Sequence, residues 1–152
     1  MKLSNHFTLE EFLKTSHPEL QLKEPIDPLY VENLGILCRA ILEPIRYYSN
    51  CKILITSGLR SEDLNKKVGG VSDSKHLTGG ACDFRFDSRL SPRKWVPFLF
   101  KHTLLSKLIY YPEELRFHVE IDMPARQTIY PIRKKFYISL SGKTYHDFTY
   151  LV

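Results

Sequence analysis

The sequence predicts an α+β domain in which helices dominate the first half of the chain and short strands the second. Apolar residues recur at helical spacing between residues 27 and 48, whereas residues 116–122 alternate strictly between apolar and polar. Residues 135–140 and 144–150 are two further strand-like runs around a Ser-Gly turn, as in a hairpin. This order favours a mostly antiparallel sheet with helices packed on one side. Because 152 residues is the size of one domain, we expect a single domain over residues 1–152.

Two helices have recognisable start signals. Thr8-Leu-Glu-Glu11 fits a capping box, which predicts a short helix. Asp27 and Pro28 suit the N-cap and first turn of a long helix that runs to about Tyr48, and Pro44 is expected to kink it or loosen one turn. The apolar residues at helical spacing in this segment are Leu29, Leu34, Leu37, Cys38, Ile41, Leu42 and Ile45.

The remaining elements are shorter. We expect strands at residues 52–56, 81–86, 108–111 and 116–122, a helix or two loose turns at residues 61–68, and a helix that Ser91-Pro92 caps and that runs through Leu99. The alternation in the fourth strand separates its two faces. Its core face carries Phe117, Val119 and Ile121, and its polar face carries Arg116, His118, Glu120 and Asp122.

Composition excludes several classes of protein. No apolar run approaches the ~18 residues of a membrane helix, so we expect no transmembrane segment. The N-terminal MKLSNHFTLEEF lacks the apolar stretch of a secretory signal peptide, which predicts synthesis in the cytoplasm. The net charge of +5 is spread along the chain, so we expect no nucleic-acid partner. Three irregularly spaced cysteines favour free thiols over a disulfide framework. We also expect a monomer.

Three residues are candidate metal ligands. His76 lies in a turn next to two glycines, Asp83 lies at the start of a strand, and His118 lies on the polar face of another strand. Two imidazoles and one carboxylate form a donor set that suits Zn²⁺, with a fourth position open to water. Metal binding would also explain why Asp83 stands in the apolar run Ala-Cys-Asp-Phe-Arg-Phe, because an unpaired carboxylate there is costly.

Each of these residues also has an ordinary interpretation. A histidine in a turn is usually part of the polar surface, and an aspartate at a strand start is often a turn or capping residue. His118 alone is compatible with a strand histidine that faces solvent. Spacing by itself therefore leaves both interpretations of His76, Asp83 and His118 open.

The segment around the first two candidates resembles a known motif. Ser74-Lys-His76-Leu-Thr-Gly79-Gly-Ala81-Cys-Asp83 matches the SxHxxGxAxD motif of the D-Ala-D-Ala carboxypeptidase and endopeptidase family of zinc peptidases. That family includes vancomycin-resistance dipeptidases and phage L-alanyl-D-glutamate endolysins, and it shares its fold with the hedgehog signalling domain. Weaker matches follow the family's order, at Phe7–Phe12, Ile55–Ser61 (TSGYRS-like, with Leu59 for the aromatic residue), Asn65, Val68–Gly70 and Phe117–Val119.

The resemblance implies roles for individual residues. His76, Asp83 and His118 would bind zinc, which would polarise the scissile carbonyl and activate water. Arg60 would hold a carboxylate or carbonyl of the substrate, and Ser74 would be a substrate-binding or supporting hydroxyl. Without the resemblance, Arg60 is equally compatible with a structural ion pair. The paired glycines that follow are expected to let the turn fold back, so that the first two ligands reach one ion.

The general base is where the chain departs from the family. Members place a carboxylate shortly before the last histidine, often three residues ahead, but that position here is Leu115. Glu113 and Glu114 lie five and four residues ahead of His118, and we favour Glu113. Glu120 shares the face of His118 and is the second candidate, either as a base or as a partner of the imidazole.

These observations predict a zinc peptidase that cleaves peptidoglycan stem peptides near a D-amino acid, as a carboxypeptidase or an endopeptidase. The alternative is a catalytically weak zinc-binding module that recognises cell wall or a protein partner. A third, remote interpretation takes the basic surface as a nucleic-acid binder. Because the substrate lies outside the cytoplasm, the resemblance favours a phage or prophage protein that reaches the wall with the help of a separate lysis partner.

Overall fold

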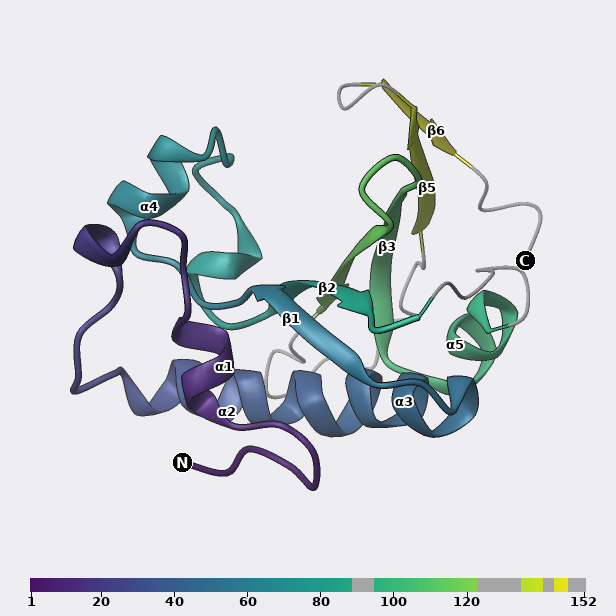
Figure 1. Cartoon of the computed structure of the whole chain (residues 1–152), viewed down its shortest axis with the longest axis horizontal. Helices are drawn as coiled ribbons and strands as arrows, with labels where there is room; N and C mark the ends of the chain where they lie inside the picture. Colours follow the sequence, from purple (N-terminus) through teal and green to yellow (C-terminus); the bar gives the residue numbers. More distant parts are fainter. Residues whose placement is uncertain (89–94, 123–134, 141–143, 148–152) are drawn as a thin grey trace.

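A computed structural model describes residues 1–88, 95–122, 135–140 and 144–147. One sheet runs through the molecule, with helices beneath it in the view of Figure 1 and α4 above β1. In chain order the elements are α1 (Leu9–Leu13), η1 (Pro18–Leu20), α2 (Pro28–Leu37), η2 (Cys38–Leu42), α3 (Glu43–Ser49), β1 (Ile53–Ser57), α4 (Glu62–Lys67), η3 (Lys75–Leu77), β2 (Ala81–Phe86), α5 (Val96–His102), β3 (Leu105–Tyr111), β4 (Arg116–Ile121), β5 (Lys135–Leu140) and β6 (Thr144–Asp147).

The sheet has six described strands in the order β1-β2-β4-β3-β5-β6. Every neighbouring pair is antiparallel except β3 and β5, which run parallel. The predicted α+β class with a mostly antiparallel sheet is therefore confirmed. The predicted hairpin is also present as β5 and β6, while its turn at residues 141–143 and its predicted end at residues 148–150 lie outside the described residues.

The predicted long helix exists but changes pitch in the middle. Residues 28–49 are helical throughout, and Cys38–Leu42 form a π-helical turn between α2 and α3. A proline inside a helix lacks an N–H and clashes with the carbonyl four residues earlier, which for Pro44 is that of Ala40. The wider π turn contains Ala40 and provides this room, so the helix loosens one turn near Pro44, which is the second of the two expected effects.

The other sequence-predicted elements are present with small shifts in their bounds. Thr8 is the N-cap of α1, and its backbone N–H donates to Glu11 Oε2 at 2.8 Å, as in the predicted capping box. The segment left open between a helix and loose turns forms α4, whose N-cap is Ser61. The predicted Ser91-Pro92 cap lies outside the described residues, which include α5 from Val96.

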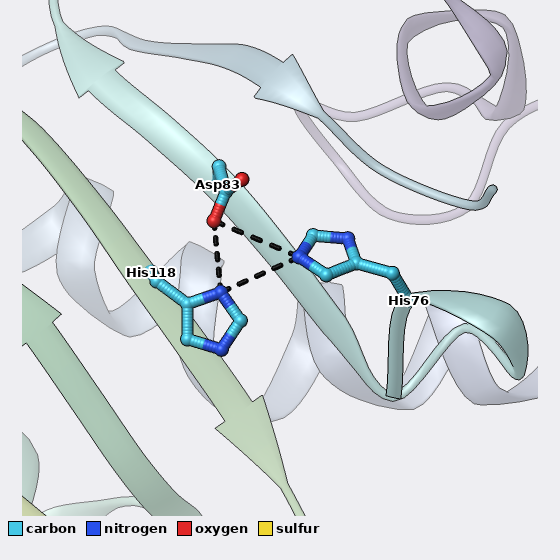
Figure 2. Close-up of side chains that lie close together, drawn as sticks. All are labelled: His76, Asp83 and His118. Carbon is cyan, nitrogen blue, oxygen red and sulfur yellow. Dashed lines mark hydrogen bonds and ion pairs between the residues drawn. The ribbon is translucent and has the colours of Figure 1, made fainter. Parts of the chain in front are cut away.

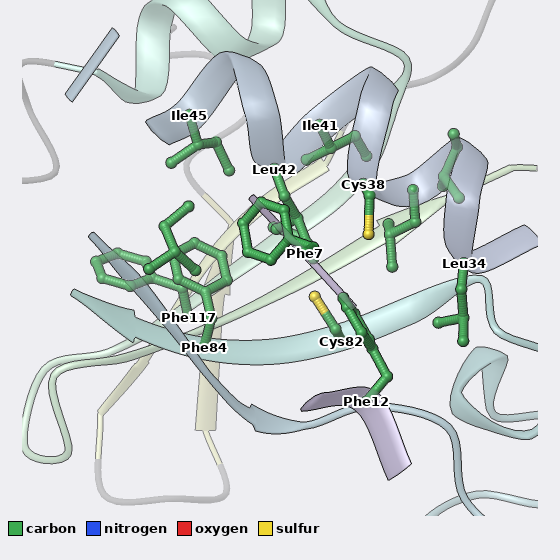
Figure 3. Close-up of a cluster of buried hydrophobic side chains, with 14 of the residues drawn as sticks. Phe7, Phe12, Leu34, Cys38, Ile41, Leu42, Ile45, Cys82, Phe84 and Phe117 are labelled. Carbon is green, nitrogen blue, oxygen red and sulfur yellow. The ribbon is translucent and has the colours of Figure 1, made fainter. Parts of the chain in front are cut away.

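The core lies between the sheet and helices α1, α2 and α3, as Figure 3 shows. Buried side chains from α2 to α3 meet the apolar faces of β2 and β4, which carry Phe84 and Phe117. The helical side chains are Leu34, Leu37, Ile41, Leu42 and Ile45. Each such side chain contributes about 1.5–3 kcal/mol by leaving water. Cys38 and Cys82 join this core as free thiols, and burial raises the pKa of Cys38 to about 12.

The alternation in β4 has the predicted consequence. Phe117, Val119 and Ile121 are buried, whereas His118 and Glu120 lie on the other face with partial exposure. The core therefore occupies one face of the sheet and leaves a polar surface on the other. Among the described residues, no helix combines the length and the apolar character needed to cross a membrane.

Candidate metal centre

Three side chains from three elements converge on the polar face of the sheet. Asp83 of β2 and His118 of β4 stand directly opposite each other in the antiparallel register, and His76 reaches them from η3 (Figure 2). His118 Nδ1 lies 2.8 Å from Asp83 Oδ1, His76 Nε2 lies 3.6 Å from the same oxygen, and the two ring nitrogens are 3.4 Å apart. All three side chains are largely buried.

This spacing fits a zinc ion. Nitrogen and oxygen donors about 2.05 Å from zinc, on the vertices of a tetrahedron, lie about 3.3 Å apart. The three observed separations of 2.8, 3.4 and 3.6 Å bracket that value. One set of described residues thus offers two imidazole nitrogens and a carboxylate oxygen within 4.8 Å of one another, which suits a catalytic zinc with one open vertex.

The ring of His76 is fixed by its second nitrogen. Its Nδ1 lies 2.7 Å from the carbonyl oxygen of Gly58, and because a carbonyl only accepts, Nδ1 carries the proton. Nε2 therefore keeps its lone pair toward Asp83 and His118. Burial lowers the pKa of His76, which favours the neutral form that a metal requires. The backbone N–H of Arg60 donates to the carbonyl of His76 at 3.0 Å and secures the turn.

Gly58 is needed at its position because the chain of α1 passes against it. A Cβ atom there would lie 2.4 Å from the carbonyl oxygen of Phe12 and 2.6 Å from its Cα, so the backbone would have to move. Of the two glycines predicted to fold the His76 turn back, Gly79 has a φ of +77° that favours glycine, whereas Gly80 has ordinary space for a Cβ, with its nearest contact at 3.5 Å.

We expect Gly58→Ala to disturb both α1 and the carbonyl that holds His76. Overpacking of this kind costs about 1–3 kcal/mol, and loss of a histidine's hydrogen-bond partner lowers metal affinity about 10- to 100-fold. Chemical denaturation and a zinc-competition titration measure the two effects. Gly80→Ala is the matched control and should change neither by much. Unchanged zinc affinity in the Gly58→Ala protein would contradict this account of how His76 is held.

The ring of His118 is held from its far side by Glu120. Glu120 Oε1 lies 2.9 Å from Nε2 of His118 and accepts from Lys107 Nζ at 2.7 Å, and Lys75 Nζ is 3.7 Å from Oε2. Burial opposes ionisation of Glu120, but hydrogen bonds from His118 and Lys107 prevail and lower its pKa from 4.5 to about 2. Glu120 is therefore an ionised acceptor that orients His118, with Nδ1 directed at the other two donors.

This shift predicts a particular loss of stability in acid. The pKa of Glu120 is lower in the folded protein than in the unfolded chain, so its ionised carboxylate stabilises the fold. This contribution to the free energy of unfolding is complete above pH 4.5 and is lost as the pH falls toward about 2. The contribution amounts to as much as about 3 kcal/mol. The test is urea unfolding in the presence of a chelator, between about pH 5 and pH 3. The free energy of unfolding should depend less steeply on pH for Glu120→Gln than for the parent. Glu62→Gln, at an exposed position on α4, is the control and should behave as the parent does. Identical slopes would rule out this role of Glu120.

The second oxygen of Asp83 faces two arginines. Arg60 Nη2 donates to Oδ2 at 3.0 Å, and Arg116 Nη1 lies 3.5 Å from the same atom. Burial would raise the pKa of Asp83, but its interactions with His118 and His76 hold that pKa well below the ordinary value. Asp83 thus carries a full negative charge between the two histidines on one side and the two guanidinium groups on the other.

The three donors lie at the floor of an open cleft of about 1140 Å³, larger than most small-molecule pockets. Its walls come from the α4–η3 segment on one side and from β3, β4 and the turn between them on the other. The sequence-predicted residues Arg60, Ser74, Glu114 and Glu120 line this cleft. Glu113 is exposed on the β3–β4 turn and is not part of the lining.

The structure adds residues that the sequence did not single out. Arg116 was assigned only to the polar face of its strand, yet it lies beside Asp83 in the cleft. Lys107 lies opposite Glu120 in the β3–β4 register, and Gly58 contributes a carbonyl rather than a side chain. The strand alternation was the available signal for Arg116. Nothing in the sequence pairs Lys107 with Glu120 or Gly58 with His76, because those contacts depend on tertiary register.

Comparison with known proteins assigns the chain to a family. The family model for peptidase M15 matches residues 5–119. The chain belongs to the peptidase M15 family. M15 peptidases are zinc-dependent metallopeptidases, and the matched segment contains His76, Asp83 and His118, the group of described residues that is able to hold the ion. No curated protein matches the chain.

Proposed function

We propose that this M15 peptidase hydrolyses peptidoglycan stem peptides at a bond beside a D-amino acid, with His76, Asp83 and His118 as zinc ligands. The observation that carries the proposal is the approach of these three donors to tetrahedral spacing, with the other nitrogen of each imidazole held by an oxygen acceptor. Action on cell wall agrees with a phage or prophage lysis protein that works beside a membrane-permeabilising partner.

Residues around the zinc ligands would bind and orient the substrate. Zinc, when bound, supplies a Lewis acid that polarises the scissile carbonyl and lowers the pKa of water. Arg60 lines the cleft beside Asp83 and would donate to the carbonyl of the substrate from a guanidinium that Ser57 Oγ holds through Nε at 2.9 Å. Ser74 lines the opposite wall, where its hydroxyl would contact the peptide backbone.

Among the three candidate glutamates, we propose Glu114 as the proton acceptor. Glu120 is hydrogen-bonded to Nε2 of His118. The imidazole ring therefore lies between the Glu120 carboxylate and the Nδ1 side of the ring, which faces the other two ligands. Glu113 is exposed on the turn and does not line the cleft, which argues against our preference from sequence. Glu114 lines the cleft, and a single guanidinium, that of Arg116, separates its carboxylate from Asp83. A base must come within hydrogen-bond reach of the proton, which Glu114 can do by a side-chain rotation.

The test uses the purified, zinc-loaded protein with isolated peptidoglycan and with short synthetic stem peptides. We expect new amino termini or free alanine to appear in step with added protein, chelation to stop the reaction, and added zinc to restore it. His76→Ala serves as the inactive control. Hydrolysis that continues after complete removal of the metal would refute the proposal.

One observation favours a second candidate, a zinc-binding module that recognises wall without rapid hydrolysis. Both cleft glutamates are engaged, Glu114 with Arg116 and Glu120 with Lys107 and His118. If these pairs persist when substrate binds, neither glutamate can accept a proton at the cleft floor. Sedimentation with peptidoglycan, with no peptide released over hours, would support this alternative.

A further inference from the structure

A second guanidinium, that of Arg116, lies in the cleft beside the metal ligands. Arg116 of β4 presents the edge formed by Nε and Nη2 to the carboxylate of Glu114, at 2.7 and 3.3 Å. We propose that this edge is the binding site for the substrate carboxylate next to the scissile bond, and that Glu114 occupies it in the free protein. The inference rests on the proposed function and deepens it by naming the charge that the substrate must carry.

The guanidinium of Arg116 is held in place by groups other than Glu114. Its central carbon lies 3.8 Å above the ring of Tyr111, and its Nη1 lies 3.5 Å from Asp83 Oδ2. Tyr111 and Asp83 therefore fix the plane and the direction of the group, and the Nε–Nη2 edge meets Glu114, which lines the cleft together with Arg116. A two-pronged edge of this kind matches the geometry of a carboxylate.

Arg60, which the sequence suggested for the same task, is less suited to it. Its Nε donates to Ser57 Oγ and its Nη2 donates to Asp83 Oδ2, so the corresponding edge is already used within the protein. The Arg60 side chain is 13% exposed, against 23% for Arg116. The two arginines thus have different roles. Arg60 supports Asp83 and donates to the substrate carbonyl, whereas Arg116 binds the substrate carboxylate.

Glu114 is an exchangeable occupant. Its side chain is 56% exposed, and it lies two residues from Arg116 on the β3–β4 turn. Exposed ion pairs of this kind contribute little to stability, so a substrate carboxylate held by further contacts in the cleft can replace it. The exchange would also release the Glu114 carboxylate beside the ligands, which is where the proposed proton acceptor is needed.

The chemistry of the substrate fits this site. In D-Ala-D-Ala, and in L-Ala-D-Glu when glutamate continues the chain through its γ-carboxyl, the carbon bonded to the scissile nitrogen carries a free carboxylate. Both bonds therefore place the same negative charge two bonds from the reacting nitrogen. Conversion of that carboxylate to an amide keeps the shape of the peptide and removes the charge that Arg116 would bind.

The experiment compares each peptide with its amide. Acyl-D-Ala-D-Ala and an L-Ala-D-isoglutamyl peptide are assayed against the forms in which this carboxylate is amidated, with the zinc-loaded parent, Arg116→Ala and Arg85→Ala. Arg85 is the matched control, because it faces Arg116 in the β2–β4 register but is exposed and is not part of the cleft lining. For the cleaved bond, the parent should prefer the carboxylate about 10- to 100-fold in kcat/KM. Arg116→Ala should lose this preference and Arg85→Ala should keep it.

Calorimetry provides a readout that does not depend on hydrolysis. The fragments on the C-terminal side of each bond, as acid and as amide, are titrated into the same three proteins. An acid preference that requires Arg116 would support the carboxylate site even if no peptide were cleaved, and the hydrolytic function alone would then fail. Equal use of acid and amide by the parent would overturn the inference.

Two further outcomes are decisive. An equal loss of preference in Arg85→Ala would show that the overall positive electrostatic field, and not the Nε–Nη2 edge, selects the acid. This would overturn the inference.

Arg116→Lys keeps a positive charge beside Asp83 but lacks the two-pronged edge, and it covers the case in which Arg116→Ala fails to fold. It should lose most of the preference while its zinc content stays at the parent value. Full preference in the lysine variant would contradict the proposed site.

Discussion

Asp83→Asn is expected to abolish zinc binding at neutral pH and to lower the free energy of unfolding of the metal-free protein by about 3 kcal/mol. The carboxylate of Asp83 interacts with four side chains. One oxygen faces His76 and His118, and the other accepts from Arg60 and lies 3.5 Å from Arg116. Asparagine keeps the shape but removes the charge, so the guanidinium of Arg60 would lose its carboxylate partner and that of Arg116 would keep only Glu114.

The loss of zinc follows from the same change. Removal of a histidine's supporting partner costs about 10- to 100-fold in metal affinity, and loss of a charged ligand costs more. Zinc content after dialysis and denaturant unfolding in chelator measure the two effects. Asp122→Asn is the control, because Asp122 pairs with Lys75 at an exposed position and should shift stability by less than about 0.5 kcal/mol. Parent-like stability of metal-free Asp83→Asn would show that the arginines do not depend on this carboxylate.

The sequence predicted the parts of the site that rest on local periodicity. Strict alternation placed His118 and Glu120 on the face opposite Phe117, and the strand register that brings Asp83 opposite His118 confirms that both lie on one surface. A buried aspartate in an apolar strand had to be compensated, and the histidines and arginines compensate it. Such inferences succeed because a period of two residues fixes the direction of a side chain without knowledge of the fold.

The sequence did not predict contacts set by register or by backbone groups. Lys107 meets Glu120 because β3 and β4 pair with a shift between Leu105 and Lys107, and no spacing along the chain encodes that shift. The β3–β4 turn, where Leu115 has a φ of 51°, decides that Glu114 pairs with Arg116 and lines the cleft while Glu113 does not. The choice among the glutamates therefore required coordinates.

Glu114→Gln is expected to lower kcat by about 100-fold or more, the usual contribution of a general base. Glu120→Gln should act differently, because that carboxylate orients His118. It should weaken zinc binding about 10- to 100-fold, with kcat largely restored at saturating zinc. Glu113→Gln should match the parent, since its side chain lies in solvent. Steady-state kinetics at several zinc concentrations separate these three results, and a parent-like kcat for Glu114→Gln would exclude it as the base.

The same variant also tests the exchange at Arg116, because the two roles of Glu114 affect different kinetic constants. Glutamine cannot accept the proton, so kcat falls, but it is also a poorer occupant of the Nε–Nη2 edge than a carboxylate. The substrate acid then competes with a neutral side chain, and its KM should fall while that of the amide stays unchanged. A residue with only a structural role in the turn would raise KM or leave it unaltered. A fall in both kcat and KM, confined to the acid substrate, would therefore identify Glu114 as both base and displaced occupant, and a KM that rises for acid and amide alike would refute the exchange.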